Sequence, residues 1–85
     1  MTHEELYRML ADNVRDEYND VIRYVNLSKA AATNELEGPA QILKDIAHEE
    51  FIHAQHVENI LKDMGVLKED NFGLKKNARE ALDSL

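Results

Sequence analysis

Three residues combine side-chain types and spacing that could bind a metal ion: Glu17, Glu50 and His53. Glu50 and His53 are three positions apart, so both would project from one face of a helix. A carboxylate oxygen combined with an imidazole nitrogen suits iron, manganese or zinc. Each of the three also falls on an expected apolar stripe, where an unpaired charge is costly unless it is protonated, paired or coordinated. The sequence therefore predicts that these three residues are metal ligands.

Long helices are expected to position these residues, because 85 residues contain only one Pro and three Gly and chain breakers are therefore few. Thr2 and Glu5 have the form of a capping box, which predicts the start of a first helix over about 3–33. Pro39 fits the first turn of a second helix over about 39–64, since its missing amide hydrogen costs nothing there.

The link between these helices is short, so we expect them to be antiparallel neighbours. Gly65 is placed to end the second helix in a left-handed cap, and a shorter third helix is predicted over about 74–84. The expected fold is all-α, a single domain over residues 1–85 made of an antiparallel two-helix hairpin and a short C-terminal helix. Such a small chain without disulfides has difficulty burying enough core alone, so self-association is expected.

Apolar residues at helical spacing define the expected core-facing stripe of each long helix. The stripes are Leu6, Leu10, Val14, Val21, Tyr24, Ser28 and Ala31 in the first helix, and Leu43, Ile46, Glu50, His53, Val57, Ile60 and Met64 in the second. Glu17 lies about 24 Å from the link along the first helix, and Glu50 and His53 lie about 16–21 Å from it along the second. The three residues are therefore expected at nearly the same height.

One hairpin supplies only these three ligands, whereas a second copy related by a two-fold axis would give four carboxylates and two imidazoles. That is the ligand set of dinuclear carboxylate sites in four-helix bundles. In such a site each Glu50 could bridge both ions, each Glu17 could chelate one, and each His53 could cap one. The sequence thus predicts a homodimer, or a larger homo-oligomer, that forms a four-helix bundle with two ions per dimer.

Composition excludes several other classes of protein. Ten basic and seventeen acidic residues give a net charge of −7, which disfavours nucleic acid as a partner and is compatible with gathering cations. The absence of Cys excludes disulfides, thiolate metal sites and a thiol nucleophile. No apolar run approaches the roughly 20 residues that would span a bilayer, and no signal peptide follows Met1. We therefore expect a cytoplasmic protein that does not bind membranes.

The pattern of Glu17, Tyr24 seven residues later, and Glu50-x-x-His53 resembles the ferritin-like superfamily, specifically its rubrerythrin branch. The resemblance covers about residues 10–64, which is half of the usual four-helix bundle. The chain is therefore most similar to two-helix ferritins stored inside encapsulin shells, which build their ferroxidase centre between subunits. An encapsulating shell is a partner that the resemblance suggests, although the C-terminal residues show no shell-docking peptide.

The resemblance also implies roles for two further residues. The Tyr24 hydroxyl would bond a ligand carboxylate; the alternative is an ordinary aromatic core residue. Asp20, one turn after Glu17, stands where some rubrerythrin-type sites place an extra carboxylate, and a surface Asp is the alternative. Rubrerythrins carry a Cys-rich electron-transfer domain that is absent here, so peroxide reduction would need an external electron donor. We do not expect His48 or His56 to be ligands.

These observations lead to one expected function and two alternatives. The expected function is that of a di-iron oxidoreductase with ferroxidase-type activity, oxidising Fe(II) with dioxygen or peroxide at a site shared between two subunits, in iron handling or oxidative-stress defence. Manganese and zinc are alternatives to iron. The first alternative is a rubrerythrin-like peroxidase with a separate electron donor. The second is a non-enzymatic oligomerisation module or structural metal-binding protein, in which a buried Glu–His pair fixes helix pairing.

Overall fold

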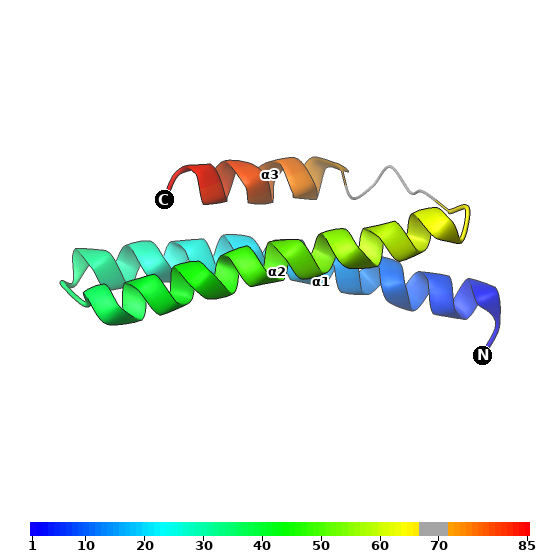
Figure 1. The fold of residues 1–85 in the computed structure, drawn as a ribbon, viewed down its shortest axis with the longest axis horizontal. Coiled ribbons are helices and arrows are strands. Elements are labelled where there is room, and N and C mark those ends of the chain that lie inside the picture. The colour runs from blue at the N-terminus through cyan, green and yellow to red at the C-terminus, as the bar shows by residue number, and fades with distance from the viewer. Residues whose placement is uncertain (67–71) are drawn as a thin grey trace.

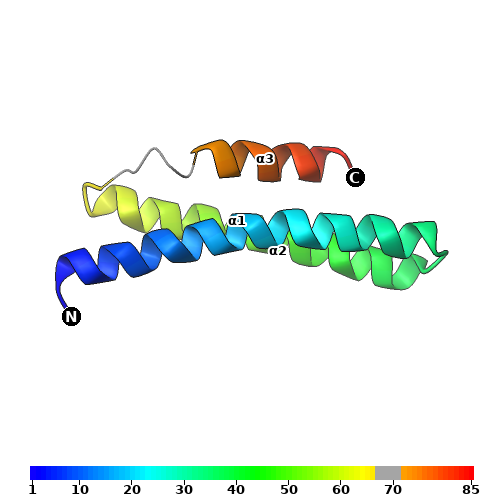
Figure 2. The same ribbon diagram turned by 180° about the vertical axis from the view of Figure 1, so that it is seen from behind.

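The computed structural model of the chain describes residues 1–66 and 72–85. It contains α1 (His3–Thr33), α2 (Glu37–Asp63) and α3 (Phe72–Asp83). Figures 1 and 2 show α1 and α2 side by side and antiparallel, with α3 along one side of the hairpin in the direction of α1. The described residues contain no strand, and none of their helices is long and apolar enough to cross a bilayer. The predicted all-α class, a long hairpin with a short C-terminal helix, is confirmed.

The helix starts reflect local capping. The Thr2 hydroxyl accepts a hydrogen bond from the Glu5 amide at 3.1 Å, as the capping box predicts. α2 begins at Glu37, two residues before the expected start, and Pro39 lies inside its first turn. Because the first amides of a helix have no intrahelical partner, Pro is tolerated throughout this turn and does not fix the helix start. α3 likewise begins two residues earlier than expected and ends one residue earlier.

Both long helices end at a residue with left-handed backbone. Glu35 has a φ of +62°, and the Leu36 amide donates to the carbonyl of Ala31 at 2.9 Å. Gly65 has a φ of +75°, and the amide after it donates to the carbonyl of Leu61 at 3.0 Å. These are the hydrogen bonds that satisfy the last carbonyls of a helix in a Schellman motif. The left-handed cap predicted at Gly65 is confirmed.

The core of the hairpin lies one residue away from the stripe expected on α2. The buried core residues are Tyr7, Val14, Tyr18, Val21 and Val25 of α1, Ala47, Phe51, Ala54 and Leu61 of α2, and Ala78 of α3. The small side chains of Ala47 and Ala54 let the helices approach closely, while the rings of Tyr18 and Phe51 fill the space beside them. Successive residues of a helix point about 100° apart. The stripe expected on α2 therefore lies on the side of the core and does not point into it.

The residues of the expected stripes that are not buried lie beside the core on a surface that we call the open face, whereas Val14, Val21 and Ser28 of the stripe expected on α1 are buried. The open face consists of Leu6, Leu10, Glu17, Tyr24 and Ala31 of α1 and Leu43, Ile46, Glu50, His53, Val57, Ile60 and Met64 of α2, all half-buried or exposed. The polar contacts to α3 start from the opposite flank of the hairpin, where Glu58 and Phe51 lie on α2 and Lys29 lies on α1. α2 thus has two apolar stripes one residue apart, and within the described part of the chain the stripe on the open face is only partly covered, with Val57 packed against the core.

The two glycines of α2 and its cap respond in opposite directions to the same substitution. Gly65→Ala should lower the free energy of unfolding by about 1 kcal/mol, because a Cβ is disfavoured at positive φ. Gly38→Ala should raise it by about 0.5–1 kcal/mol, because Gly38 is helical and an added Cβ meets nothing within 4 Å. Urea unfolding followed by circular dichroism at one protein concentration measures both. Equal stability of the two variants would contradict the left-handed cap.

Candidate metal centre

The three predicted ligands lie at mid-length of the hairpin. Glu17 is one residue from the midpoint of α1, Glu50 is at the midpoint of α2, and His53 follows one turn later. Because the antiparallel helices lie side by side (Figure 1), these residues share one level of the hairpin. Glu17 and Glu50 are half-buried and His53 is exposed, so the set stands at the open face rather than in the core of the single chain.

Glu17 has an unusual electrostatic environment. Burial raises its pKa above the ordinary value, the nearby Glu50 carboxylate raises it further, His53 partly offsets this, and Asp20 adds a smaller upward contribution. The Oε2 atom of Glu17 is buried and accepts no hydrogen bond within the described part of the chain. Such an unsatisfied buried acceptor costs about 1–3 kcal/mol. A cation between these carboxylates would remove that cost.

Two residues expected near the ligands have other contacts within the chain. Asp20 forms an ion pair with Arg23, at 3.7 Å between Oδ1 and Nη2. The guanidinium of Arg23 also lies 5.4 Å from the ring centre of Tyr24. Among the residues that the structure describes, no hydrogen bond joins the Tyr24 hydroxyl to Glu17 or Glu50. The roles predicted for Asp20 and Tyr24 thus remain predictions.

The single chain does not close a metal site by itself. Over residues 1–66 and 72–85, no group of three or more His, Asp or Glu side chains is arranged to hold an ion. The donors that are present, two carboxylates and one imidazole at one level, nevertheless have the chemistry that iron, manganese and zinc accept. The residues fit such an ion in type.

Sequence reasoning missed a second polar cluster at the same level, on the flank that faces α3. Tyr18 is fully buried, and its hydroxyl donates to the Glu58 carboxylate. The other carboxylate oxygen of Glu58 lies 3.8 Å from Lys75 Nζ. Burial, followed by the hydrogen bond and charge of Glu58, raises the pKa of Tyr18 above its ordinary value. The signal in the sequence was a second apolar stripe that passes through Tyr18, one position after Glu17.

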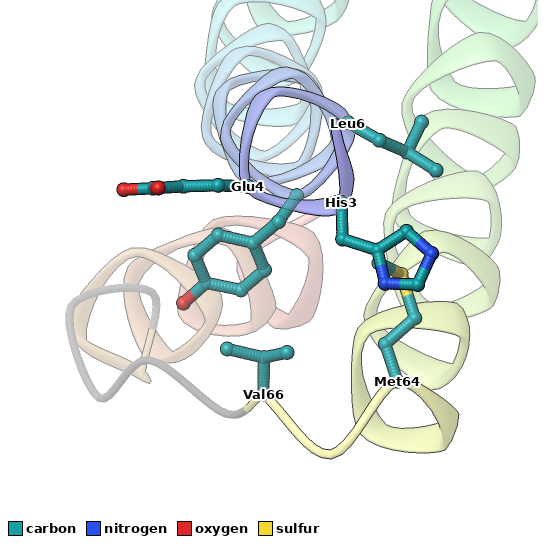
Figure 3. A pocket seen from close by; sticks show the side chains of 6 residues that line it. His3, Glu4, Leu6, Met64 and Val66 are labelled. Carbon is teal, nitrogen blue, oxygen red and sulfur yellow. The ribbon is translucent and has the colours of Figure 1, made fainter. Parts of the chain in front are cut away.

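A pocket of about 560 Å³ lies at the end of the hairpin remote from the α1–α2 turn. Its mostly apolar lining consists of His3, Glu4, Leu6, Tyr7, Met64 and Val66. Figure 3 shows Glu4 and Leu6 projecting from opposite sides of α1, with His3 beside Met64. His3 precedes Glu17 by about 21 Å along the helix at 1.5 Å per residue. The pocket is therefore separate from the candidate metal centre.

The unsatisfied carboxylate predicts a pH-dependent gain from Glu17→Gln in the metal-free protein. Because the folded-state pKa of Glu17 is raised, wild type loses stability relative to the Gln variant as pH rises above the unfolded-state value of about 4.3. We expect the variant to be about 1 kcal/mol more stable at pH 7 and equal to wild type at pH 3, where Glu17 is protonated in both states. Urea unfolding with a chelator present measures this, with Glu49→Gln as the exposed control. If Glu17→Gln is no more stable than wild type at pH 7, the unsatisfied, partly buried state of the Glu17 carboxylate is contradicted.

Comparison with known proteins agrees with this arrangement. The family model described as Rubrerythrin matches residues 3–83, nearly the whole chain. No curated protein and no solved structure matches the chain. Rubrerythrin-family domains typically bind iron through carboxylates, which indicates a di-iron carboxylate protein. The resemblance to the rubrerythrin branch is confirmed, whereas the likeness to shell-stored two-helix ferritins stays a prediction; the chain belongs to the rubrerythrin family of ferritin-like proteins.

Proposed function

We propose that this chain oxidises Fe(II) with dioxygen or peroxide at a di-iron site completed by two copies of the chain. The observation that carries the proposal is the buried, unsatisfied Oε2 of Glu17, which shares its level with Glu50 and His53. Family membership supports iron as the metal. The absence of a closed ligand group within the described part of one chain supports a site that needs a second copy.

The open face supports a second copy as the partner. Leu10, Ile46 and Val57 on this face are only half-buried, and Ile60 is 47% exposed. Apolar side chains left partly exposed along one face are typical of an interface. Because the ligands lie at mid-length of both helices, a two-fold axis perpendicular to the hairpin at that level would align the hairpins over their full length. The same two-fold rotation would place the ligands of both copies at the same level along the paired hairpins.

In this arrangement each side chain has a distinct task. Glu17 and Glu50 would supply anionic oxygens, which stabilise Fe(III) more than Fe(II), and His53 would supply a nitrogen donor. The apolar side chains of the open face would exclude bulk water from the site once it is covered. Bound iron supplies the one-electron change between Fe(II) and Fe(III), which none of these side chains can provide. The net charge of −7 would raise the local concentration of the cationic substrate.

The ligand assignment is tested by two histidine variants of α2. His53→Ala should abolish tight binding of two ions per dimer and reduce Fe(II) oxidation to the uncatalysed rate, because the site loses its nitrogen donors. His56→Ala removes an equally exposed imidazole about one turn away and should leave both unchanged. Elemental analysis after anaerobic Fe(II) loading and the absorbance of the ferric product in air measure the two quantities. Two ions per dimer in His53→Ala would refute the assignment.

The same measurements separate the alternative functions. Peroxide consumption that exceeds the iron supplied, in the presence of a reductant, would identify a peroxidase with a separate electron donor. A purified wild-type protein that takes up neither iron nor manganese nor zinc would identify a non-enzymatic oligomerisation module. Stoichiometric zinc without redox activity would identify a structural metal protein.

The shared site is tested by two isoleucines of α2 that are almost equally exposed, Ile60 at 47% and Ile52 at 49%. Ile60 is seven positions after His53 and lies on the open face, whereas Ile52 points about 100° away from it. Ile60→Lys should therefore weaken both self-association and metal binding about tenfold or more, since a buried charge at an interface is costly. Ile52→Lys should change neither. Sedimentation measures self-association, and metal titration measures metal binding. Tight metal binding by a monomeric Ile60→Lys variant would overturn the site shared between two copies.

A further inference from the structure

The flank of the hairpin that faces α3 carries a cluster of five side chains at the level of the metal centre. We call it the α3 clamp; it consists of Tyr18 of α1, Phe51 and Glu58 of α2, and Lys75 and Arg79 of α3. The cluster connects all three helices, and neither the ligand assignment nor the proposed reaction uses it.

Two series of contacts within the α3 clamp connect α3 to the core. In one, Lys75 Nζ lies 3.8 Å from the Glu58 carboxylate, which accepts the hydrogen bond of Tyr18. In the other, the Arg79 guanidinium lies 5.0 Å from the ring centre of Phe51. The rings of Phe51 and Tyr18 meet at 5.5 Å with their planes tilted by 59°, so the two series join. Lys75 and Arg79 are four positions apart and share one face of α3.

Each aromatic residue of the α3 clamp directly follows a predicted ligand. Tyr18 comes after Glu17, and Phe51 comes after Glu50. A rotation or slide of either helix would therefore move the ring and the neighbouring carboxylate together, in directions about 100° apart. Fixing the two rings against each other consequently fixes the height and rotation of the backbone positions that carry both carboxylates.

We infer that Tyr18, Glu58 and Lys75 are positioning residues for the metal centre, which hold the Glu17 and Glu50 carboxylates in place from the opposite flank of the hairpin. This inference rests on the proposed function and adds to it a role for α3. The apolar contacts of α3, made by Leu74, Ala78, Ala81 and Leu82, cover the core without any of these polar groups. The cluster can therefore be weakened while the apolar packing of the three helices remains.

The test compares four variants of the full chain that keep this apolar packing. Tyr18→Phe keeps the ring and removes the hydroxyl, and Lys75→Met removes the charge facing Glu58. Lys76→Met removes an equal charge from the next residue, which is exposed. We expect Tyr18→Phe to raise the Co(II) dissociation constant about tenfold, the lower end of the effect of groups that bond metal ligands directly, because Tyr18 acts on the ligands only through the helix positions. Lys75→Met should raise it by less, Lys75→Arg should restore it, and Lys76→Met should have no effect.

Two further readouts distinguish positioning from general stability. The visible absorption spectrum of bound Co(II) reports ligand geometry and should change in Tyr18→Phe and Lys75→Met, while circular dichroism and sedimentation match wild type. In the metal-free protein, the carboxyl ¹³C signals of Glu17 and Glu50 should shift in the same two variants and not in Lys76→Met. Wild-type Co(II) affinity and spectrum in Tyr18→Phe would overturn the inference.

Failure of the proposed function gives a different result. If wild type takes up no metal, the di-iron function is refuted, and the carboxyl signals of Glu17 and Glu50 alone decide whether the α3 clamp positions them. Unchanged signals in Tyr18→Phe would then overturn the inference as well. Equal losses of affinity in Lys75→Met and Lys76→Met would show a general effect of charge, which also overturns it.

Discussion

An unsatisfied carboxylate on a half-covered helix face is the constraint on which the rest of this structure depends. Glu17 lies beside the core stripe of α1, and its Oε2 atom is buried without a hydrogen-bond partner in the described part of the chain. Burial raises the pKa of this carboxyl. Glu50 at the same level adds repulsion. A single hairpin therefore stores an electrostatic cost at its centre, and only a proton, a cation or a cationic group can relieve it.

The sequence was sufficient to predict the three helices to within two residues at each end, whereas the ligand assignment stays a prediction. Thr2 and Gly65 mark helix ends through local hydrogen bonds and backbone angles, which depend on few neighbours. The choice of core stripe was not predictable in the same way. Both stripes of α2 are apolar at helical spacing, and the contact at Ala47 and Ala54 is decided by how closely the helices approach. Periodicity alone cannot rank two stripes that both have to be buried in a complete bundle.

The contacts around the site were harder still to predict. The position of Tyr24 on the open face follows from its spacing, but the partner of its hydroxyl depends on a surface that one chain does not supply. Asp20 pairs with Arg23, three positions later on the same helix. The spacing is visible in the sequence, but the sequence does not show whether Asp20 contacts Arg23 or a metal ion. The hydrogen bond between Tyr18 and Glu58 joins residues 40 positions apart, and only the packed hairpin brings them together.

The two flanks of the hairpin differ in charge balance, and under the proposed function this difference would link assembly to metal binding. On the flank facing α3, the acidic Glu58 is balanced by Lys75 from the same chain, so packing is complete without a ligand. On the open face, Glu17 and Glu50 are balanced only in part by His53. Joining two open faces would bury apolar surface but bring four carboxylates together, so the cost of assembly would fall when cations are present. Whatever binds the assembled form more tightly than the separate chains also stabilises it, and each ion would thereby favour the dimer that holds it.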